Sequence, residues 1–535
     1  MAGHFNMQQI LKALPFFWVI FNGFHISLIK CHLFTSYNID VKRLANVVSD
    51  VDLNIFLTDY ILMDHAGDHL KSYLEEYNKI RRDIIENDVN KFLTNPINEY
   101  ILVGRLAEWN KINELIANMN SKNASFLESS THERKNNDDF LLNVLFARKL
   151  LPTDEDVTGA AYGLLRLQMT YQLDTLDMAD GRILSSGWKI NSSSHLTAQD
   201  CWQLGQQAYM IGQYDYAVSW LKESLQRHHE ERYKTVRQEQ ILQYHVFASY
   251  KQGQLNVASE LTQQLLQLMS PRGQTELSNI FDAIESRRDY TQESTGQEDH
   301  SEDYNALCRG ENLMDKETES QLHCSYSFGN SGSAFLRFQP VKKELVSLNP
   351  YIVMFHDIIS DQDIESITQI AKPTMRQVLT INALTEEGFQ SQRRVGETTI
   401  LKDGNYSVLQ RISRHMEDLI GYVVSDASNI LSYGVGGHFS PHCDYIRNKT
   451  IEAKTGNHLA TLIIYLNEVE NGGATVFPIV KTRVKPVKGS AAFWYNLNPD
   501  NGEGNPTTLH ASCPILSGSK WVLVKSINSL EQYYG

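Results

Sequence analysis

The sequence predicts a multidomain α + β protein, and three observations carry this prediction. The chain has 535 residues, which is too long for one hydrophobic core at about 100 to 200 residues per domain. Helical apolar spacing prevails up to about residue 268, and short β-branched and aromatic runs prevail from Val341 onward. We therefore expect a helical N-terminal region, an α domain of paired helices and a C-terminal β-rich domain.

The composition is that of a folded, acidic protein. Hydrophobic residues make up 42% and charged residues 21% of the chain, a balance that excludes a disordered or fibrous protein. Acidic groups exceed basic ones to give a net charge of -14. Such a field repels phosphate backbones, so we expect no nucleic-acid partner.

The N-terminus predicts entry into the secretory pathway. Lys12 precedes an apolar run from Ala13 to Phe21, which is too short to cross a bilayer and suits a signal peptide within residues 1–30. We expect no transmembrane anchor. A lumenal glycoprotein is compatible with four Asn-x-Ser/Thr sequons, at Asn123, Asn191, Asn405 and Asn448.

The cysteines are too sparse for a disulfide-built scaffold. No Cys-x-x-Cys pair occurs, which excludes a zinc ribbon or a thioredoxin-type site. Cys308 and Cys324 flank a polar stretch, where a bridge would stabilise a slack loop by roughly 3 kcal/mol. The alternative is two unpaired thiols.

An amphipathic helix is predicted within the helical N-terminal region, residues 31–145. Its apolar residues step by three and four, as in a coiled coil. They are Met63, Ala66, Leu70, Tyr73, Tyr77, Ile80 and Ile84. This seam fits either a two-chain coiled coil or a helix packed inside its own bundle.

The middle of the chain, residues 151–268, predicts tetratricopeptide-like helix pairs. Small and apolar residues fall at the required offsets, at Leu204, Gly205, Ala208, Gly212, Tyr214, Ala217 and Leu221. A weaker copy surrounds Gly253 and Ala258. Stacked helix pairs leave a concave face, and aromatic residues of this region can lie on it.

Aromatic residues cluster in or beside this predicted face. They are Tyr209, Tyr214, Tyr216, Trp220, Tyr244 and Tyr250. Aromatic side chains can line a groove for a proline-rich peptide, which is already ordered as polyproline II. The alternative is that about half of them fill the inter-helix core.

The composition turns polar between Ser286 and Gln321, and residues 269–340 are interpreted as a linker region. From residue 341 to 535, strand-like runs alternate with Gly, Asn and Pro. Helices are expected at Asp361 to Ala371 and at Ser407 to Ile420. This third of the chain is therefore predicted to be β-rich with helices on one side.

A candidate metal site lies in this C-terminal region. His442 and Asp444 are two residues apart, which on an extended strand places both side chains on one face, and His510 follows near another strand. Two histidines and one carboxylate form the facial triad of ferrous oxygenases. A zinc site is a poor interpretation, because thiolate ligands and a fourth protein ligand are missing. Lys520 could hold a dicarboxylate co-substrate, and Thr475 could donate a hydrogen bond into the same site.

Four C-terminal motifs resemble the catalytic domain of the prolyl 4-hydroxylase alpha subunit: YGVGGHFSPHCD, NGGATVFP, GSAAFWYNL and HASCPILSGSKW. The heptad segment with FTSYNID resembles the family's dimerising region, and LTAQDCWQLGQQAY resembles its peptide-binding domain. Cys308 in ALCRGE and the later Cys324 resemble its disulfide pair. The resemblance covers nearly the whole chain and implies a double-stranded β-helix (jelly-roll) oxygenase domain.

By motif position, the resemblance implies that His442, Asp444 and His510 are iron(II) ligands and that Lys520 binds the C5 carboxylate of 2-oxoglutarate. Weaker members of the same pocket are Thr475 and Tyr433. The implied reaction hydroxylates C4 of peptidyl proline in collagen-like X-Pro-Gly sequences and converts 2-oxoglutarate to succinate and CO2, with L-ascorbate in support. The implied assembly is an α2β2 heterotetramer in the endoplasmic reticulum lumen, with protein disulfide isomerase as the β subunit.

Three residues depart from the family pattern. Asn528 stands where the family has a basic residue, Cys513 has no cysteine downstream with which to pair, and Cys443 stands between two metal ligands. Alternation along a strand points Cys443 away from the iron. Because the first departure could impair turnover, the alternative function is a lumenal subunit that binds proline-rich peptide with weak or no turnover.

Overall fold

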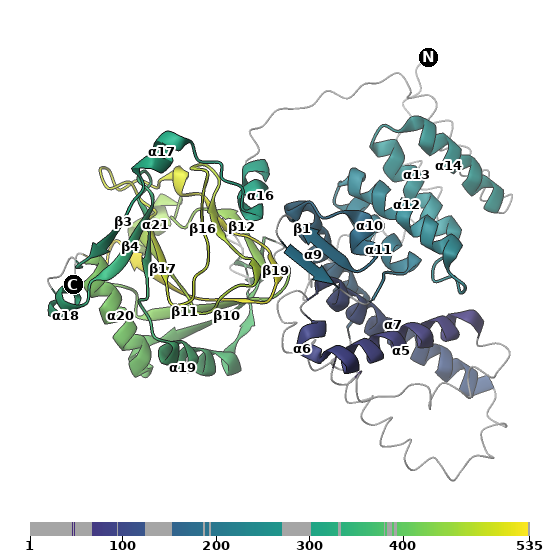
Figure 1. The fold of residues 1–535 in the computed structure, drawn as a ribbon, viewed down its shortest axis with the longest axis horizontal. Coiled ribbons are helices and arrows are strands. Elements are labelled where there is room, and N and C mark those ends of the chain that lie inside the picture. The colour runs from purple at the N-terminus through teal and green to yellow at the C-terminus, as the bar shows by residue number, and fades with distance from the viewer. Residues whose placement is uncertain are drawn as a thin grey trace, which may run out of the picture. The chain divides into compact units, whose positions relative to one another are not determined.

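The computed structural model describes residues 67–93, 95–122, 152–185, 188–191, 194–269, 301–329, 333–378, 380–381, 388–389 and 393–532, with Ala45 and Val48. The predicted signal peptide lies outside these residues. The chain divides into two compact units (Figure 1), the second of which comprises the described residues from Ser301 onward and the short segment Met169–Gln172. Within the described part of the chain, no helix has the length and apolar character needed to cross a membrane.

In the described part of the first unit from residue 67 onward, the first helices are α5 (Gly67–Asn87), α6 (Val89–Phe92) and α7 (Pro96–Lys122). The described residues of the predicted seam on α5, from Leu70 to Ile84, are all buried. The Tyr73 ring lies 6.0 Å from that of Trp109 on α7, and its hydroxyl donates to the Arg105 carbonyl at 3.2 Å. The seam therefore packs inside its own bundle, which is the second of the two sequence interpretations.

A buried ion pair joins these helices to the repeat region of the same unit. Arg105 on α7 donates to both carboxylate oxygens of Asp200, at 2.9 and 2.6 Å. Asp200 also completes a capping box with Thr197 at the start of α11 (Ala198–Met210). Burial alone would raise the pKa of the Asp200 carboxyl, but Arg105 outweighs it and holds that pKa below its usual range.

The repeat region contains two helix pairs, as predicted. They are α11 with α12 (Tyr214–Glu230), and α13 (Gln238–Lys251) with α14 (Leu255–Leu268). A Cβ on Gly205 would lie 2.6 Å from Leu221, so glycine is what allows α11 and α12 to approach. Each pair turns at a glycine of positive φ, Gly212 at 78° and Gly253 at 83°. Upstream lie α9 (Asp154–Tyr171), α10 (Thr175–Ala179) and the hairpin β1 (Arg182–Ser185) and β2 (Trp188–Asn191).

The second unit is built on two antiparallel sheets. The nine-stranded sheet has the order β3-β4-β5-β17-β13-β20-β11-β10-β6. Its strands are β3 (Cys324–Ser327), β4 (Val341–Ser347), β5 (Ile352–His356), β6 (Arg376–Gln377), β10 (Glu397–Lys402), β11 (Ala427–Tyr433), β13 (His458–Tyr465), β17 (Ala491–Tyr495) and β20 (Lys520–Asn528).

The five-stranded sheet has the order β16-β15-β18-β12-β9. Its strands are β9 (Arg394–Val395), β12 (His438–His442), β15 (Thr475–Phe477), β16 (Thr482–Val484) and β18 (His510–Ser512). Two short pairs complete the strands: β7 (Thr380–Ile381) with β8 (Gly388–Phe389), and β14 (Asn471–Gly472) with β19 (Ile515–Ser517).

Helices cover one face of the nine-stranded sheet, as the sequence predicted (Figure 1). Both predicted helices have the expected bounds, α19 (Asp361–Ala371) and α20 (Ser407–Ile420). Their apolar residues form one core with Leu462, Leu523 and Ile527 of the sheet. A second core, which includes Tyr465, Phe477 and Trp494, contains residues from both sheets. The second core is where the candidate site lies. The shorter helices are α21 (Lys449–Thr455) and the 3-10 turns η3 (Lys372–Thr374), η4 (Asp403–Asn405) and η5 (Pro506–Thr508).

The region interpreted as a linker is more structured than expected. After a segment outside the described residues, it forms α16 (Ser301–Arg309), α17 (Lys316–Gln321), β3 and α18 (Ala334–Phe338). β3 pairs with β4 and so extends the nine-stranded sheet. The polar composition reflects exposed helices and an edge strand.

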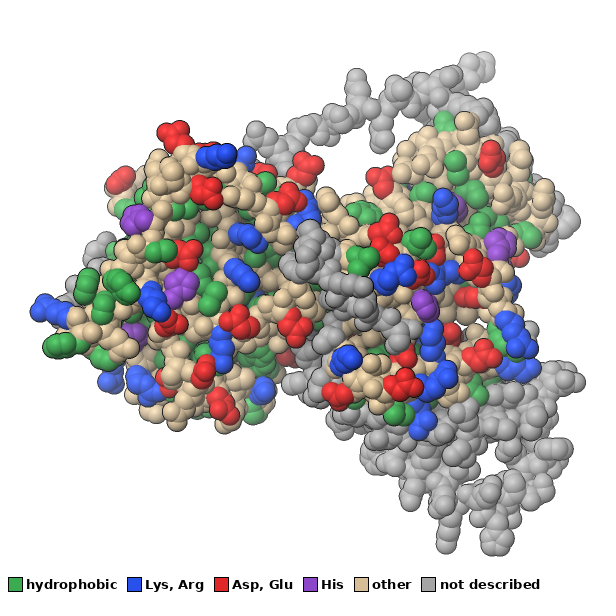
Figure 2. All heavy atoms as spheres, viewed as in Figure 1, with side chains coloured by type: hydrophobic (Ala, Val, Ile, Leu, Met, Phe, Trp, Pro, Cys, Tyr) green, Lys and Arg blue, Asp and Glu red, His purple; other side chains and the backbone are tan. Residues whose placement is uncertain are grey.

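On the visible face of the molecule, acidic and basic side chains are interspersed (Figure 2).

Candidate metal and co-substrate site

His442 and His510 meet across the five-stranded sheet. β12 and β18 are antiparallel neighbours, and His442 lies directly opposite His510 in their register. Asp444 lies beyond the end of β12, so the sequence interpretation of two ligands on one regular strand was wrong in that detail. Its carboxylate still lies 3.5 Å from His442 Nε2 and 3.6 Å from His510 Nε2. The three groups can each offer one ligand atom, all within 4.8 Å of one another.

Backbone carbonyls orient both imidazole rings. His442 Nδ1 lies 2.8 Å from the Ser440 carbonyl oxygen, and His510 Nδ1 lies 3.1 Å from that of Thr508. A carbonyl oxygen only accepts, so each Nδ1 carries the proton and each Nε2 presents a lone pair towards Asp444. Burial, with the neighbouring His442, lowers the pKa of His510 to about 4. This ring is therefore neutral and ready to bind a metal at physiological pH.

Polar residues beneath the site orient Asp444. The Thr461 hydroxyl donates to Asp444 Oδ2 at 2.6 Å, Asn496 Nδ2 donates to Thr461 Oγ1 at 2.8 Å, and Trp494 Nε1 donates to Asn496 Oδ1 at 2.8 Å. Burial would raise the pKa of the Asp444 carboxyl, but His510, His442 and Thr461 together hold it well below its usual range. The carboxylate is thus ionised and held in place.

These three residues fit a ferrous ion. Two imidazoles and one carboxylate converge, which leaves other coordination positions for further ligands, as in a facial triad. Among the described residues, no fourth protein group joins the cluster. Cys443, which follows the last residue of β12, is only partly buried and does not belong to this cluster.

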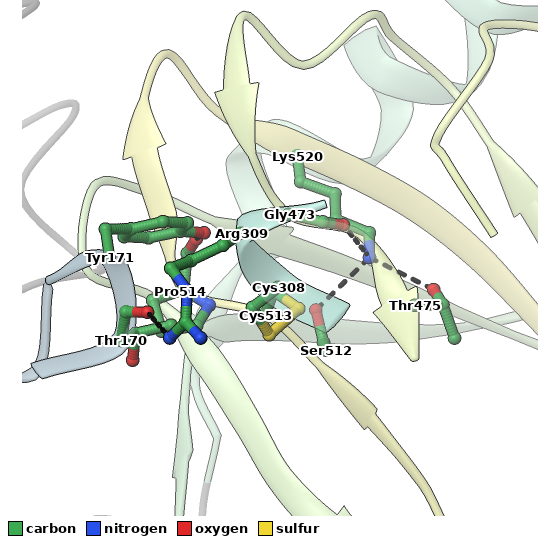
Figure 3. Close-up of a disulfide and its surroundings, with 10 residues drawn as sticks. All are labelled: Thr170, Tyr171, Cys308, Arg309, Gly473, Thr475, Ser512, Cys513, Pro514 and Lys520. Carbon is green, nitrogen blue, oxygen red and sulfur yellow. Dashed lines mark hydrogen bonds between the residues drawn. A yellow bond between two sulfur atoms is a disulfide. The ribbon is translucent and has the colours of Figure 1, made fainter. Parts of the chain in front are cut away.

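Lys520 lies at the start of β20 with its ammonium group buried in the same core. It is 2% exposed, and its Nζ donates to the Gly473 carbonyl at 2.7 Å, to Ser512 Oγ at 3.2 Å and to Thr475 Oγ1 at 3.4 Å (Figure 3). All three acceptors are neutral. Burial lowers the pKa of Lys520 to about 7. A buried cation without a carboxylate partner among the described residues is suited to receive an anion.

Thr475 and Tyr433 both lie beside Lys520. The Thr475 hydroxyl also lies 2.9 Å from that of Tyr465, a buried tyrosine that the sequence interpretation missed. Tyr433 is directly opposite Lys520 in the pairing of β11 with β20, so the two side chains share a face. The position of Tyr433 opposite Lys520 follows from the register of β11 against β20, which the spacing of residues in the sequence does not give.

The disulfide prediction was wrong. Cys308 is bonded to Cys513, 205 residues further along the chain, with a Cα–Cα distance of 5.5 Å (Figure 3). Cys324 is an exposed free thiol at the start of β3. The physical reason is that α16 packs close to β15 and β16, next to the segment that follows β18. Cys513 therefore did not lack a partner.

Asn528 is engaged away from the triad. Its side-chain amide donates to the Thr455 carbonyl at 2.9 Å, and its amide oxygen accepts from the Leu530 backbone N–H at 2.9 Å. The first bond connects the end of β20 to the end of α21, and the second fixes the segment that follows β20. The residue thus secures a surface connection of the second unit.

The predicted aromatic residues divide between the core and a partly exposed cluster. Trp220 is fully buried and donates to Gln168 at 2.7 Å, and Tyr250 packs against a buried cluster. Tyr209 lies at the centre of the exposed cluster, with its ring centroid 5.7 Å from Tyr214 and 5.9 Å from Tyr244. Sequence reasoning missed two further members, Trp202 and Phe247. Tyr216, which we also expected in the groove, is a half-buried residue of α12.

Three family models match the chain in order. Residues 57–185 match the prolyl 4-hydroxylase alpha-subunit N-terminal region. Residues 198–282 match the prolyl 4-hydroxylase peptide-substrate-binding domain, and residues 428–528 match the 2OG-Fe(II) oxygenase superfamily. The last range contains all three triad residues and Lys520.

Curated relatives match over almost their full length. Prolyl 4-hydroxylase subunit alpha-1 of Rattus norvegicus is 32% identical over 95% of this chain and 96% of its own. Subunit alpha-2 of Caenorhabditis elegans is 33% identical over 91% of this chain and 90% of its own. Among solved structures, the viral collagen prolyl hydroxylase of Paramecium Bursaria Chlorella virus-1 in its 2OG complex is 25% identical. That match covers 33% of this chain and 94% of the other, with a TM-score of 0.27.

Proposed function

The chain belongs to the prolyl 4-hydroxylase alpha-subunit family, and from this premise we propose that it hydroxylates peptidyl proline at C4 in collagen-like X-Pro-Gly sequences. It is an oxygenase that depends on Fe(II) and 2-oxoglutarate. The observation that carries the proposal is the convergence of His442, Asp444 and His510 in the same core as Lys520, whose buried ammonium group has no carboxylate partner among the described residues.

Each residue of the site has a defined task. His442, Asp444 and His510 would hold Fe(II), which when bound supplies the chemistry that couples decarboxylation of 2-oxoglutarate to succinate with hydroxylation. Lys520 holds the distal carboxylate and so orients the co-substrate. Trp494 and Phe477 contact the His510 ring, at centroid distances of 4.7 and 5.8 Å, and exclude water from one side of the site.

The aromatic cluster of the first unit, which we define as Trp202, Tyr209, Tyr214, Tyr244 and Phe247, is the proposed contact surface for the proline-rich substrate. Its rings are partly exposed and belong to three successive helices of the repeat region. Flat aromatic faces pack well against the rings of a polyproline II peptide. Support comes also from the match of residues 198–282 to a peptide-substrate-binding domain.

We place the enzyme in the endoplasmic reticulum lumen, as an α2β2 heterotetramer with protein disulfide isomerase as the β subunit. The apolar N-terminal run and the sequons support this proposal. Asn448 is exposed and caps the N-terminus of α21, where a glycan would meet solvent. L-ascorbate, typical of the family, is expected to sustain the iron in its ferrous form.

The test is 2-oxoglutarate decarboxylation by the full chain, measured with and without a Pro-Pro-Gly repeat peptide. We expect decarboxylation to rise strongly with peptide and one hydroxyproline to form for each succinate. Peptide binding with no succinate, in the chain assembled with its isomerase partner, would favour the non-catalytic binding subunit instead.

A further inference from the structure

Ser512 is in contact with Lys520 and has no part in the function assigned above. Its hydroxyl oxygen lies 3.2 Å from Lys520 Nζ, and the residue is only partly buried (Figure 3). The other two acceptors of Lys520, the Gly473 carbonyl and Thr475, complete a ring of oxygens around the ammonium group.

The three acceptors differ in their chemistry. A carbonyl oxygen only accepts hydrogen bonds, so Gly473 can position the lysine but cannot bind a carboxylate. The Thr475 hydroxyl already lies 2.9 Å from that of Tyr465. A serine hydroxyl donates one hydrogen bond and accepts two, so Ser512 can accept from Lys520 and donate to a carboxylate oxygen at the same time.

The sheet register places Ser512 on the ligand-binding face. Ser512 is two residues after His510 on β18, so both side chains leave the same side of the strand, about 7 Å apart at 3.4 Å per residue. On the neighbouring strand β15, Thr475 lies directly opposite Ser512 in the register. One face of β18 thus carries the metal ligand His510 and, next to it, Ser512 beside Lys520. A five-carbon dicarboxylate can span the distance between these two residues.

The backbone around Ser512 is fixed on its C-terminal side. Cys513 is tied to Cys308 by the disulfide, and its N–H donates to the Ala474 carbonyl at 2.8 Å. The Pro514 carbonyl accepts from the Tyr171 hydroxyl at 2.6 Å. These bonds hold the strand end where Ser512 faces Lys520, so little ordering is required when a ligand binds.

We propose that Ser512 is a further co-substrate-binding residue, whose hydroxyl donates to the distal carboxylate of 2-oxoglutarate beside the Lys520 ammonium. This inference rests on the proposed function, because it takes 2-oxoglutarate as the ligand. It adds a residue that selects for a carboxylate at the far end of the keto acid.

The experiment compares two keto acids that differ only at that end. The Fe(II)-loaded full chain is titrated under nitrogen with 2-oxoglutarate and with 2-oxopentanoate, which has a methyl group in place of the distal carboxylate. Ser512→Ala should weaken 2-oxoglutarate binding about tenfold, the order expected for one lost hydrogen bond to a charged group, and leave 2-oxopentanoate binding unchanged. Ser428→Ala, which removes another buried hydroxyl of the same unit, should change neither affinity.

A second pair of variants keeps the test decisive if the alanine variant is poorly folded. Ser512→Thr and Ser512→Val have nearly the same shape, and only the first has a hydroxyl, so Thr should bind 2-oxoglutarate more tightly than Val by a similar factor. Equal loss for both keto acids, or no difference between Thr and Val, would overturn the assignment of Ser512. If the unmodified chain does not prefer 2-oxoglutarate to 2-oxopentanoate, the proposed function fails with it.

Discussion

Thr461 donates a 2.6 Å hydrogen bond to the Asp444 carboxylate, and Asn496 donates to the same Thr461 hydroxyl at 2.8 Å. Thr461 lies on β13, and Asn496 directly follows β17, the neighbour of β13 in the nine-stranded sheet, whereas Asp444 follows a strand of the other sheet. The larger sheet therefore orients a metal ligand that the smaller sheet positions.

This relationship predicts that Thr461→Val weakens metal binding. The carboxylate loses the hydrogen bond that fixes its orientation, and changes in residues that orient metal ligands typically cost about 10- to 100-fold in affinity. Titration calorimetry with Mn(II) should show a loss of that order. Thr399→Val is a suitable control, because it removes a buried hydroxyl of the same unit that bonds to Thr374 instead. Equal Mn(II) affinity in the chain with and without Thr461→Val would contradict the role of Thr461.

The charge on Lys520 predicts an unusual pH dependence of stability in the metal-free chain. Burial lowers the folded-state pKa to about 7 from an ordinary value of 10.5. Below pH 7 the amine is charged in both states, so folding bears the full cost of burying the charge. Between about pH 7 and 10.5 the unfolded chain binds more protons, and stability rises with pH by about 1.4 kcal/mol per unit.

Lys520→Met removes this dependence. In urea unfolding at pH 6 the variant should be more stable than the unmodified chain, and the gap should shrink by about 3 kcal/mol at pH 9. Lys525 is the matched control, since it is buried in the same strand but paired with Asp403. Lys525→Met should be less stable than the unmodified chain at pH 6, because it leaves Asp403 buried without its cation. A gap for Lys520→Met that does not vary with pH would show that the ammonium is solvated.

The fold was more predictable than the details of the site. Alternating apolar runs and helical spacing identified the main strands and gave the bounds of α19 and α20, because burial of one face dictates those patterns. His442, Asp444, His510 and Lys520 were identified through motifs. Ser512, Thr461 and Asn496 were missed, because they act through hydrogen bonds across strands and nothing in their own spacing distinguishes them.

The disulfide is a second feature that the sequence alone did not predict correctly. Cys324 is near Cys308 in the sequence, and a short loop favoured that pair. The folded chain brings α16 next to β15, the neighbour of β18 in the sheet, so Cys513, which directly follows β18, becomes the neighbour of Cys308. Sequence distance predicts a disulfide only where no tertiary contact competes with it.

Peptide mapping without reductant should therefore recover Cys308 linked to Cys513, while N-ethylmaleimide labels the exposed Cys324. Cys513→Ser should lower stability by about 3 kcal/mol, as is typical when a native bridge is lost. Cys324→Ser should have no effect on stability. Recovery of a peptide that links Cys308 to Cys324 would refute the observed pairing.

The aromatic cluster predicts separate control of substrate and co-substrate affinity. Tyr209 contacts three other rings of the cluster, so Tyr209→Ala removes its centre and should weaken binding of a proline-rich peptide by about 2 kcal/mol. In kinetics the KM for peptide should rise, whereas the apparent affinity for 2-oxoglutarate should stay the same, because Lys520 belongs to the other unit. Tyr233→Ala, on the loop between α12 and α13, should change neither value and serves as the control. Circular dichroism establishes that helix content is retained. If peptide KM does not respond to Tyr209→Ala in a folded variant, the cluster is not the substrate-binding surface.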